Sequence, residues 1–185
     1  RIGFVGVGRM GANMARCLKD KGYNITAVQD HHVPVGESLA KELSCEAAAS
    51  PARVAEISDI VLTVVTDDAA MDDIFSETSH SSLLTHAKNR LFINFATVDP
   101  ETHIKAEALV EAKGGTNLEA LMASSITQAR EGTLYLMCGG KKSVFEKAGP
   151  LLEACILYTF DAADEPLSVD LGGRRTSNNK TYTHN

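Results

Sequence analysis

The sequence of 185 residues lacks the spacing patterns of disulfide-stabilised and metal-binding proteins. Its four cysteines lie far apart and form no CxxC pair, and three of them sit in apolar runs, so reduced, structural thiols are expected. They are Cys17, Cys45, Cys138 and Cys155. The six histidines show no HxxxH or HExxH spacing, and the adjacent His31 and His32 cannot share one helix face as ligands do. No metal site is therefore predicted.

A basic stripe and a long apolar run are also missing. The formal net charge is -6, so nucleic acid is not an expected partner. No apolar run approaches the length of a membrane-spanning helix, so no membrane partner is expected. The sequence begins with a strand-like run, RIGFVGV, and not with a signal peptide, which favours a cytoplasmic protein. Apolar residues make up 44%, and the length suits one domain, or one domain plus a fragment of another.

Short apolar, β-branched runs alternate with amphipathic stretches along the chain. Several of these runs are apolar throughout, which is typical of parallel strands buried on both faces. Strands are expected over residues 2–7, 25–29, 60–65, 91–95, 133–138 and 155–160. The alternation of strands and helices predicts an α/β fold with a doubly wound, mostly parallel sheet and helices on both of its faces.

The composition changes after residue 160. Before that point helix signals are clear: in VDPETHIKAEALVEAKGG, Asp99 fits an N-cap, Pro100 fits the first turn, and Gly114 follows the last helical residue. Residues 161–185 show little periodicity and could bury little surface. We therefore expect a folded domain over residues 1–160 and a polar tail, or a remnant of an interdomain segment, over residues 161–185.

The segment GFVGVGRMGANMARCLKDKGYNITAVQD, residues 3–30, contains the pattern G-x-G-x-x-G between an expected strand and an expected helix. Gly6 permits a tight turn, Gly8 lets the backbone approach a pyrophosphate, and Gly11 lets the helix pack closely on the strand. The start of the helix then offers free N–H groups to the phosphates. This context predicts a Rossmann-type dinucleotide-binding domain, and a glycine turn used only for packing is the alternative.

Asp30 ends the second expected strand and indicates which dinucleotide is bound. A carboxylate there can accept both ribose hydroxyls of NAD and would repel the 2′-phosphate of NADP, so NAD is predicted over NADP. His31 and His32 follow it directly, and protonated imidazoles could accept a phosphate at low pH. The candidate cofactor-binding residues of this segment are Gly6, Val7, Gly8, Arg9, Met10, Gly11 and Asp30.

The same segment resembles the start of the β-hydroxyacid dehydrogenases, a family that includes 3-hydroxyisobutyrate dehydrogenase, tartronate semialdehyde reductase and 6-phosphogluconate dehydrogenase. Met10 after the first two glycines, followed by GANMA, is more specific than the glycines alone. The resemblance continues through SDIVLTVVTDDAAMDDIF, FINFATVDPET and EALMASSITQAREGTLYLMCGG, and covers roughly residues 1–160.

The resemblance implies further residues of a cofactor and substrate site. The turn from Val65 to Thr66 would lie along the cofactor, and Thr97 would sit near the nicotinamide. The stretch EALMASSITQA falls where the family has a loop that grips the substrate carboxylate, which makes Ser124 and Ser125 candidate substrate-binding residues.

Several positions of this stretch depart from the family pattern. The family's serine before Thr97 is replaced by Ala96, and its substrate serine by Ala123, so the substrate could differ from 3-hydroxyisobutyrate. Ser124 and Ser125 replace two glycines of the family, and a polar turn without a binding role is the alternative interpretation of these two serines.

The family's acid/base is a lysine beyond the dinucleotide domain, followed by a helical domain that also supplies most oligomer contacts. Lys180 is the candidate for that lysine, although the spacing of its neighbours departs from the family pattern, and an exposed lysine is the alternative. The resemblance thus implies an NAD-dependent oxidoreductase that acts on a small 3-hydroxyacid, forms a homo-oligomer, and is truncated and weak or inactive as an isolated chain. The alternative is a non-catalytic NAD(P)-binding or interaction module.

Overall fold

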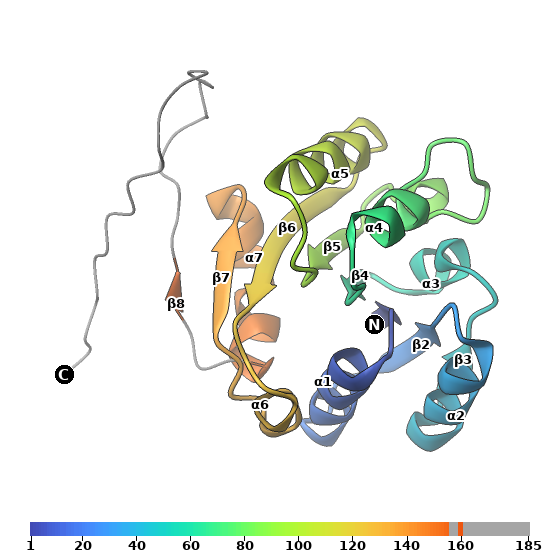
Figure 1. The fold of residues 1–185 in the computed structure, drawn as a ribbon, viewed down its shortest axis with the longest axis vertical. Coiled ribbons are helices and arrows are strands. Elements are labelled where there is room, and N and C mark those ends of the chain that lie inside the picture. The colour runs from blue at the N-terminus through green and yellow to red at the C-terminus, as the bar shows by residue number, and fades with distance from the viewer. Residues whose placement is uncertain (156–158, 161–185) are drawn as a thin grey trace.

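The alternating segments form one eight-stranded sheet in a computed structural model, which describes residues 1–155 and 159–160. The strand order is β3-β2-β1-β4-β5-β6-β7-β8 (Figure 1). The strands are β1 (Ile2–Val5), β2 (Ile25–Gln29), β3 (Glu46–Ala47), β4 (Ile60–Thr63), β5 (Leu91–Asn94), β6 (Thr116–Met122), β7 (Leu136–Gly139) and β8 (Thr159–Phe160).

All strand pairs from β3 to β6 are parallel, the β6–β7 pair is antiparallel, and β8 is parallel to β7. Strands β2 and β3 lie on one side of β1, and β4, β5 and β6 lie on the other side. The carboxyl ends of these parallel strands therefore lie at one edge of the sheet. The direction in which successive strands are added reverses between β1 and β4.

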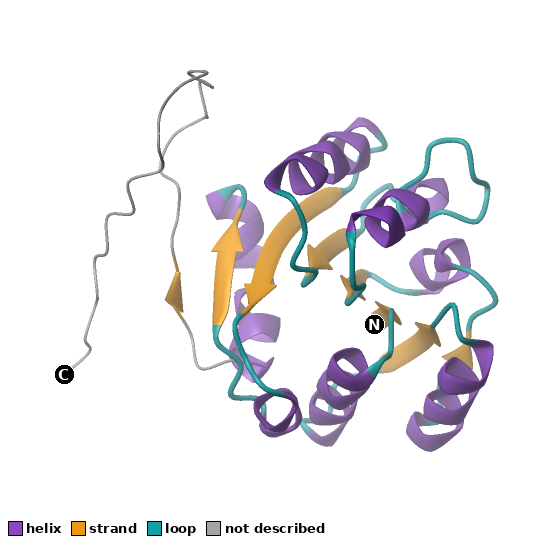
Figure 2. Ribbon diagram, viewed as in Figure 1, coloured by secondary structure: helices purple, strands orange, loops and turns teal. Residues whose placement is uncertain are grey.

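Helices cover both faces of this sheet (Figure 2). Helices α1, α2, α6 and α7 contribute to one apolar core, and α3, α4 and α5 to the other. The helices are α1 (Arg9–Asp20), α2 (Val33–Leu43), α3 (Pro51–Ile57), α4 (Asp68–Ile74), α5 (Pro100–Ala112), α6 (Ile126–Glu131) and α7 (Lys142–Cys155), with a short 3-10 helix over Leu83–His86. The predicted Rossmann-type, doubly wound and mostly parallel fold is confirmed.

The central strands are buried on both faces. Every residue of β1 and β5 is buried, as expected for parallel strands between two helical layers. Successive side chains alternate between the cores: Leu62 and Ile93 face α1 and its neighbours, while Phe92 faces α3, α4 and α5.

A row of buried polar side chains crosses β4, β5 and β6. The Thr63 hydroxyl donates to Asn94 Oδ1 at 2.6 Å, and Asn94 Nδ2 donates to Asn117 Oδ1 at 2.9 Å. Thr63 and Asn94 are 0% exposed and Asn117 is 3% exposed. These hydrogen bonds satisfy polar groups that would otherwise destabilise the core.

The last third of the domain differs from what the sequence predicted in one expected strand, one unexpected strand and the length of one loop. Cys155 is the last residue of α7, not the start of a strand over 155–160, because the helical apolar face that includes Leu151 and Leu152 continues to it. Strand β6 was not expected at all. Its last four residues begin the stretch EALMASSITQA, so the substrate loop implied by the resemblance is limited to residues 123–125.

The helix signals of α5 were interpreted correctly. Asp99 accepts a hydrogen bond from the Glu101 N–H at 2.9 Å, Pro100 is the first helical residue, and Gly114 follows the C-cap with a positive φ of 77°. The expected tail, residues 161–185, and the candidate Lys180 lie outside the described residues, so the predicted division at residue 160 stays a prediction.

Candidate cofactor-binding site

The candidate site lies at the edge where the parallel strands end. In open α/β sheets, ligands bind in the crevice outside the carboxyl ends of the strands, where the direction of strand addition reverses. Here that point lies between β1 and β4, and the glycine-rich loop follows β1 directly. The fold therefore brings the loop of residues 6–11 to the position that a dinucleotide would occupy.

Two of the three glycines are required by the packing of the loop. Gly6 has a φ of 85°, and a Cβ there would lie 2.8 Å from the carbonyl carbon of Val64 and closer still to its oxygen. A Cβ at Gly11 would overlap the carbonyl oxygen of Gly6 and lie 3.3 Å from the Cβ of Val64. The loop thus packs tightly against the segment after β4, and neither position can accept a side chain without displacing backbone.

Gly8 is different, because no atom lies within 4 Å of the position that a Cβ would take. Gly8 is exposed, and the space next to its α-carbon is open. Packing therefore does not explain a glycine here, whereas close approach of a ligand does.

The start of α1 fits an anionic ligand. Side chains cap four other helices: Ser50 caps α3, Asp67 caps α4, Asp99 caps α5 and Ser125 caps α6. Helix α1 begins after Gly8 with no capping side chain and no acidic residue in its first turn. Its first N–H groups and the positive end of its dipole therefore face the open space, and the exposed Arg9 adds a positive charge there.

The Asp30 carboxylate connects β2 to the glycine loop. Its Oδ2 accepts a hydrogen bond from the Val7 N–H at 2.8 Å, and its Oδ1 accepts from the His32 N–H at 2.9 Å. The side chain is 8% exposed, and His31 Nδ1 lies 3.3 Å from Oδ1. A carboxylate oxygen has two lone pairs, so Oδ2, which accepts one bond, can still accept a ribose hydroxyl, and Oδ1 can do so where His31 does not donate to it.

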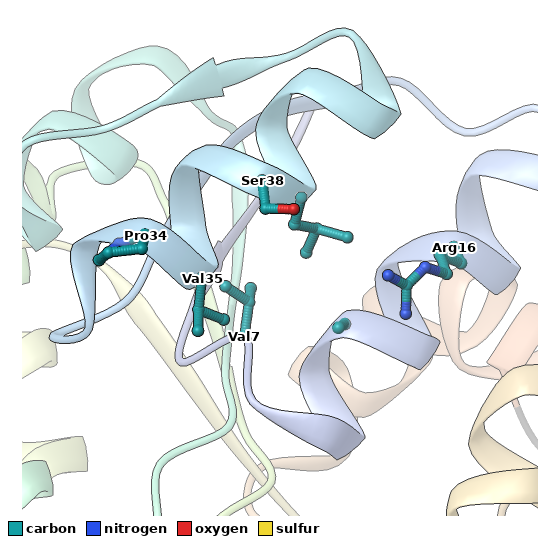
Figure 3. A pocket seen from close by; sticks show the side chains of 7 residues that line it. Val7, Arg16, Pro34, Val35 and Ser38 are labelled. Atoms are coloured by element: carbon teal, nitrogen blue, oxygen red, sulfur yellow. The ribbon is translucent and has the colours of Figure 1, made fainter.

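Two hollows flank this loop region. One, of about 390 Å³, is lined by Asp30, His31, Glu37 and residues 47–49, and lies at the carboxyl ends of β2 and β3. The other, of about 280 Å³, lies between α1 and α2, where the side chains of Val7 and Val35 approach one another (Figure 3). The first adjoins the acidic residue of the site and is the one that a nucleoside beside Asp30 would enter.

The remaining cofactor candidates lie on the loops after β4 and β5. Val65 is half-buried, Thr66 is exposed, and Thr97 is exposed at the carboxyl end of β5. The fold thus brings residues far apart in sequence to the same edge as the glycine loop.

Sequence reasoning missed two side chains behind these loops. Asp68 and His103 bond to the loop that follows β5. The signals available were an acidic residue just after a strand and a histidine on the buried face of a helix, and neither is specific on its own.

The two serines of the expected substrate loop make hydrogen bonds within the protein. Ser124 Oγ accepts from the Tyr135 N–H at 2.6 Å and lies 3.3 Å from the Tyr135 carbonyl oxygen, to which it can donate. Ser125 caps α6: its Oγ accepts from the Gln128 N–H at 3.3 Å, and the Gln128 side chain accepts from the Ser125 N–H at 2.8 Å. Contacts of this kind are those of a polar turn, and a role in substrate binding stays a prediction.

Residues 1–155 and 159–160 contain neither a metal-binding cluster nor a membrane-spanning helix. Within that part of the chain no three His, Cys, Asp or Glu side chains are grouped so that they could hold a metal ion. Within the same part, none of the helices combines the length and the apolar character needed to cross a membrane.

A doubly wound sheet with a glycine-rich loop, an uncapped helix and an acidic side chain at its switch point defines a dinucleotide-binding domain of the Rossmann type. The model of one family, described as the NAD binding domain of 6-phosphogluconate dehydrogenase, matches residues 1–158. The chain belongs to this family, and the resemblance to the β-hydroxyacid dehydrogenases is confirmed.

Similar proteins include enzymes and a protein named as a nuclear factor. Mitochondrial 3-hydroxyisobutyrate dehydrogenase of Mus musculus is 32% identical over 152 residues, which are 82% of this chain and 44% of that protein. The cytokine-like nuclear factor N-PAC of Anopheles gambiae is 29% identical over 165 residues, which are 89% of this chain and 28% of that protein. The chain thus spans less than half the length of both.

A solved structure shows the same fold. The Mycobacterium tuberculosis 3-hydroxyisobutyrate dehydrogenase, solved with L-serine, superposes with a TM-score of 0.76 at 26% identity. The match covers 87% of this chain and 53% of that one.

Proposed function

We propose that this chain is the NAD-binding half of an NAD-dependent β-hydroxyacid oxidoreductase. The observation that carries the proposal is the geometry around Gly8, where the α-carbon faces open space at the uncapped start of α1 and Asp30 is bonded to the adjacent Val7. Family membership and the dehydrogenases among the similar proteins support it.

Each part of the site has a role in binding the dinucleotide. The N–H groups at the start of α1, with Arg9 and Met10, would hold the pyrophosphate. Asp30 would accept the hydroxyls of the adenosine ribose and disfavour a 2′-phosphate. Val65, Thr66 and Thr97 would line the remaining half of the cofactor.

The chemistry requires more than the dinucleotide site. When bound, NAD accepts a hydride from the carbinol carbon of a small hydroxyacid, whose hydroxyl proton must leave at the same time. General acid–base help with such a proton is typically worth ~10²–10⁴-fold in rate. We assign substrate binding to Ser124 and Ser125, and the proton to Lys180, as predictions from the family resemblance.

Two measurements test this function. Titration of the protein with NADH, followed by NADH fluorescence, should show saturable binding, and the chain has no tryptophan whose emission would interfere. Steady-state NADH formation with 3-hydroxyisobutyrate, L-serine, D-glycerate and 6-phosphogluconate should then be slow or undetectable for these 185 residues alone. Absence of NADH binding would contradict the proposed function. Robust turnover that Lys180→Ala abolishes would show that residues 161–185 complete an active site.

The second candidate is an NAD-binding module without catalysis. The likeness to a protein named as a cytokine-like nuclear factor favours it, because that name describes no dehydrogenase. A binder needs no acid/base, so NADH binding without turnover, in the full product of the gene as well as in these 185 residues, would support this candidate. A cytoplasmic location and a homo-oligomer stay predictions, and the mouse relative is named as mitochondrial.

A further inference from the structure

We propose that Asp68 and His103 are positioning residues for the nicotinamide half of the cofactor, at its nicotinamide ring. They hold the loop after β5, and Asp68 ties that loop to the one after β4. This inference rests on the proposed function, because it requires that a dinucleotide binds at the glycine loop.

The strand order shows where that half must lie. Asp30 stands at the end of β2 and the glycine loop at the end of β1, and the strands run in the order β2-β1-β4-β5. With its adenosine ribose at Asp30 and its pyrophosphate at α1, a dinucleotide crosses the sheet edge toward β4 and β5. The nicotinamide half therefore meets the loops that follow these two strands.

Asp68 joins the two loops through a single oxygen atom. It is the first residue of α4, and its Oδ1 accepts hydrogen bonds from the Asp99 N–H at 3.0 Å and from the Thr102 hydroxyl at 2.6 Å. These two bonds, that of Thr102 first, lower the pKa of Asp68, so the carboxylate is ionised at neutral pH. The start of α5 is thus fixed to the start of α4.

His103 holds the other end of the same loop. Its side chain is 3% exposed, and Nε2 lies 3.1 Å from the carbonyl oxygen of Ala96. A carbonyl can only accept, so Nε2 carries the proton in this bond. Nδ1 is buried and has no hydrogen-bond partner among the described residues. Burying a histidine with one unpaired nitrogen destabilises the fold relative to an apolar side chain. The interaction that the structure shows for it is the hydrogen bond to the Ala96 carbonyl.

The loop between these two contacts contains Thr97 and Val98. Its backbone is bonded at Ala96 by His103 and at Asp99 by Asp68, while Thr97 between them is exposed. A further polar contact between the two helices, the Lys105–Asp72 ion pair at 2.6 Å, touches neither loop. Loss of Asp68 or His103 should therefore move Thr97 and leave the glycine loop and Asp30 in place.

The experiment compares two ligands that differ only beyond the pyrophosphate and its ribose. NADH carries the nicotinamide, and ADP-ribose does not. Dissociation constants of both are measured by calorimetry for the wild type, Asp68→Ala, Asp68→Asn and His103→Gln, with Asp72→Ala as the matched control. NADH fluorescence reports the surroundings of the nicotinamide in the same samples.

We expect Asp68→Ala to weaken NADH binding by about three- to tenfold, the usual effect of losing one or two hydrogen bonds, and to leave ADP-ribose binding within about twofold. Asp68→Asn should recover most of the loss, because its amide oxygen still accepts from Asp99 and Thr102. Asp72→Ala should change neither constant. Asp68 is exposed, so its variants should fold even if His103→Gln does not.

Equal weakening of NADH and ADP-ribose by Asp68→Ala, or no change in either, would overturn the inference while the proposed function stands. Wild-type protein that binds neither ligand would overturn both. Binding of ADP-ribose without any contribution from the nicotinamide in the wild type would overturn the inference alone, since nothing would then need positioning.

Discussion

The carboxylate of Asp30 accepts a hydrogen bond from the backbone N–H of Val7 at 2.8 Å. The acidic residue that would select the cofactor therefore also fixes the shape of the loop that would hold its phosphates. Selectivity and loop geometry cannot vary independently at this site, and the first prediction follows from that coupling.

Asp30→Ala should affect cofactor preference and stability together. The wild type should bind NADH more tightly than NADPH, by severalfold to a hundredfold if the repulsion of a 2′-phosphate costs about 1–3 kcal/mol. The variant should lose most of that preference, and its melting temperature should fall because the N–H groups of Val7 and His32 lose their acceptor. Calorimetry with both cofactors and thermal unfolding test this, with Glu37→Ala in the same hollow as control. Equal affinity of the wild type for both cofactors would contradict it.

Alanine at two of the three glycines, Gly8 and Gly11, should separate binding from folding. Gly8→Ala places a methyl group in the open space before α1, so it should weaken NAD binding at least tenfold, about 1.4 kcal/mol, with little change in melting temperature. Gly11→Ala would overlap the Gly6 carbonyl and should lower the melting temperature instead. Unchanged NAD affinity in Gly8→Ala would refute the assignment of the phosphate site.

The thiols should make the protein sensitive to alkali. Burial raises the pKa of Cys138 to about 11 and that of Cys155 to about 12, from an ordinary value of 9.0. In the unfolded chain both thiols ionise first as the pH rises, so their contribution to stability is complete below pH 9 and is lost as the pH passes the folded values. Denaturant unfolding between pH 8 and about pH 11 should show a falling free energy of unfolding. Replacement of both cysteines by alanine should flatten that dependence, and an unchanged slope would argue against this origin.

Thiol labelling gives a second view of the same burial. At pH 8 the half-buried Cys45 should react before the buried Cys138 and Cys155, although burial raises its pKa as well. Mass spectrometry of the native protein after a short exposure to iodoacetamide distinguishes the sites, and faster labelling of Cys155 would contradict the packing of α7.

The outer face of β7 should promote self-association. Tyr135 is 42% and Met137 is 45% exposed, and Met137 is paired with Leu121 of β6, so apolar side chains lie together on that face. Light scattering at micromolar concentration should detect dimers or larger species. The pair Tyr135→Ser and Met137→Gln should shift them toward monomer, and Ile104→Gln, at an exposed position on α5, should not. A wild type that stays monomeric over a wide concentration range would refute this prediction.

The sequence predicted the elements whose signals are local. The glycine spacing, the cap at Asp99 and the apolar strands β1 and β5 depend on neighbouring residues, and all are present in the structure. Strand β6 was missed because TNLEALM mixes polar and helix-favouring residues, and its extended form depends on pairing with β5 and β7.

The site was predicted less completely for the same reason. The bond between Asp68 and Asp99 joins residues 31 positions apart, and neither type of residue signals a partner at that distance. The bond of Asp30 to Val7 likewise depends on β2 lying beside β1, so the sequence could indicate the acidic residue without indicating its contact with the loop.

The hydrogen-bonded row of Thr63, Asn94 and Asn117 fixes the register of β4, β5 and β6 below the edge where the site lies. Parallel strands of apolar side chains could slide by two residues and still present the same faces to the same cores. Such a slide would shift the following loop by about 7 Å. It would also separate Asn94 from both partners and leave a buried amide without hydrogen bonds. One register is therefore favoured over its neighbours, and three buried side chains set the relative positions of the loops that follow β4, β5 and β6.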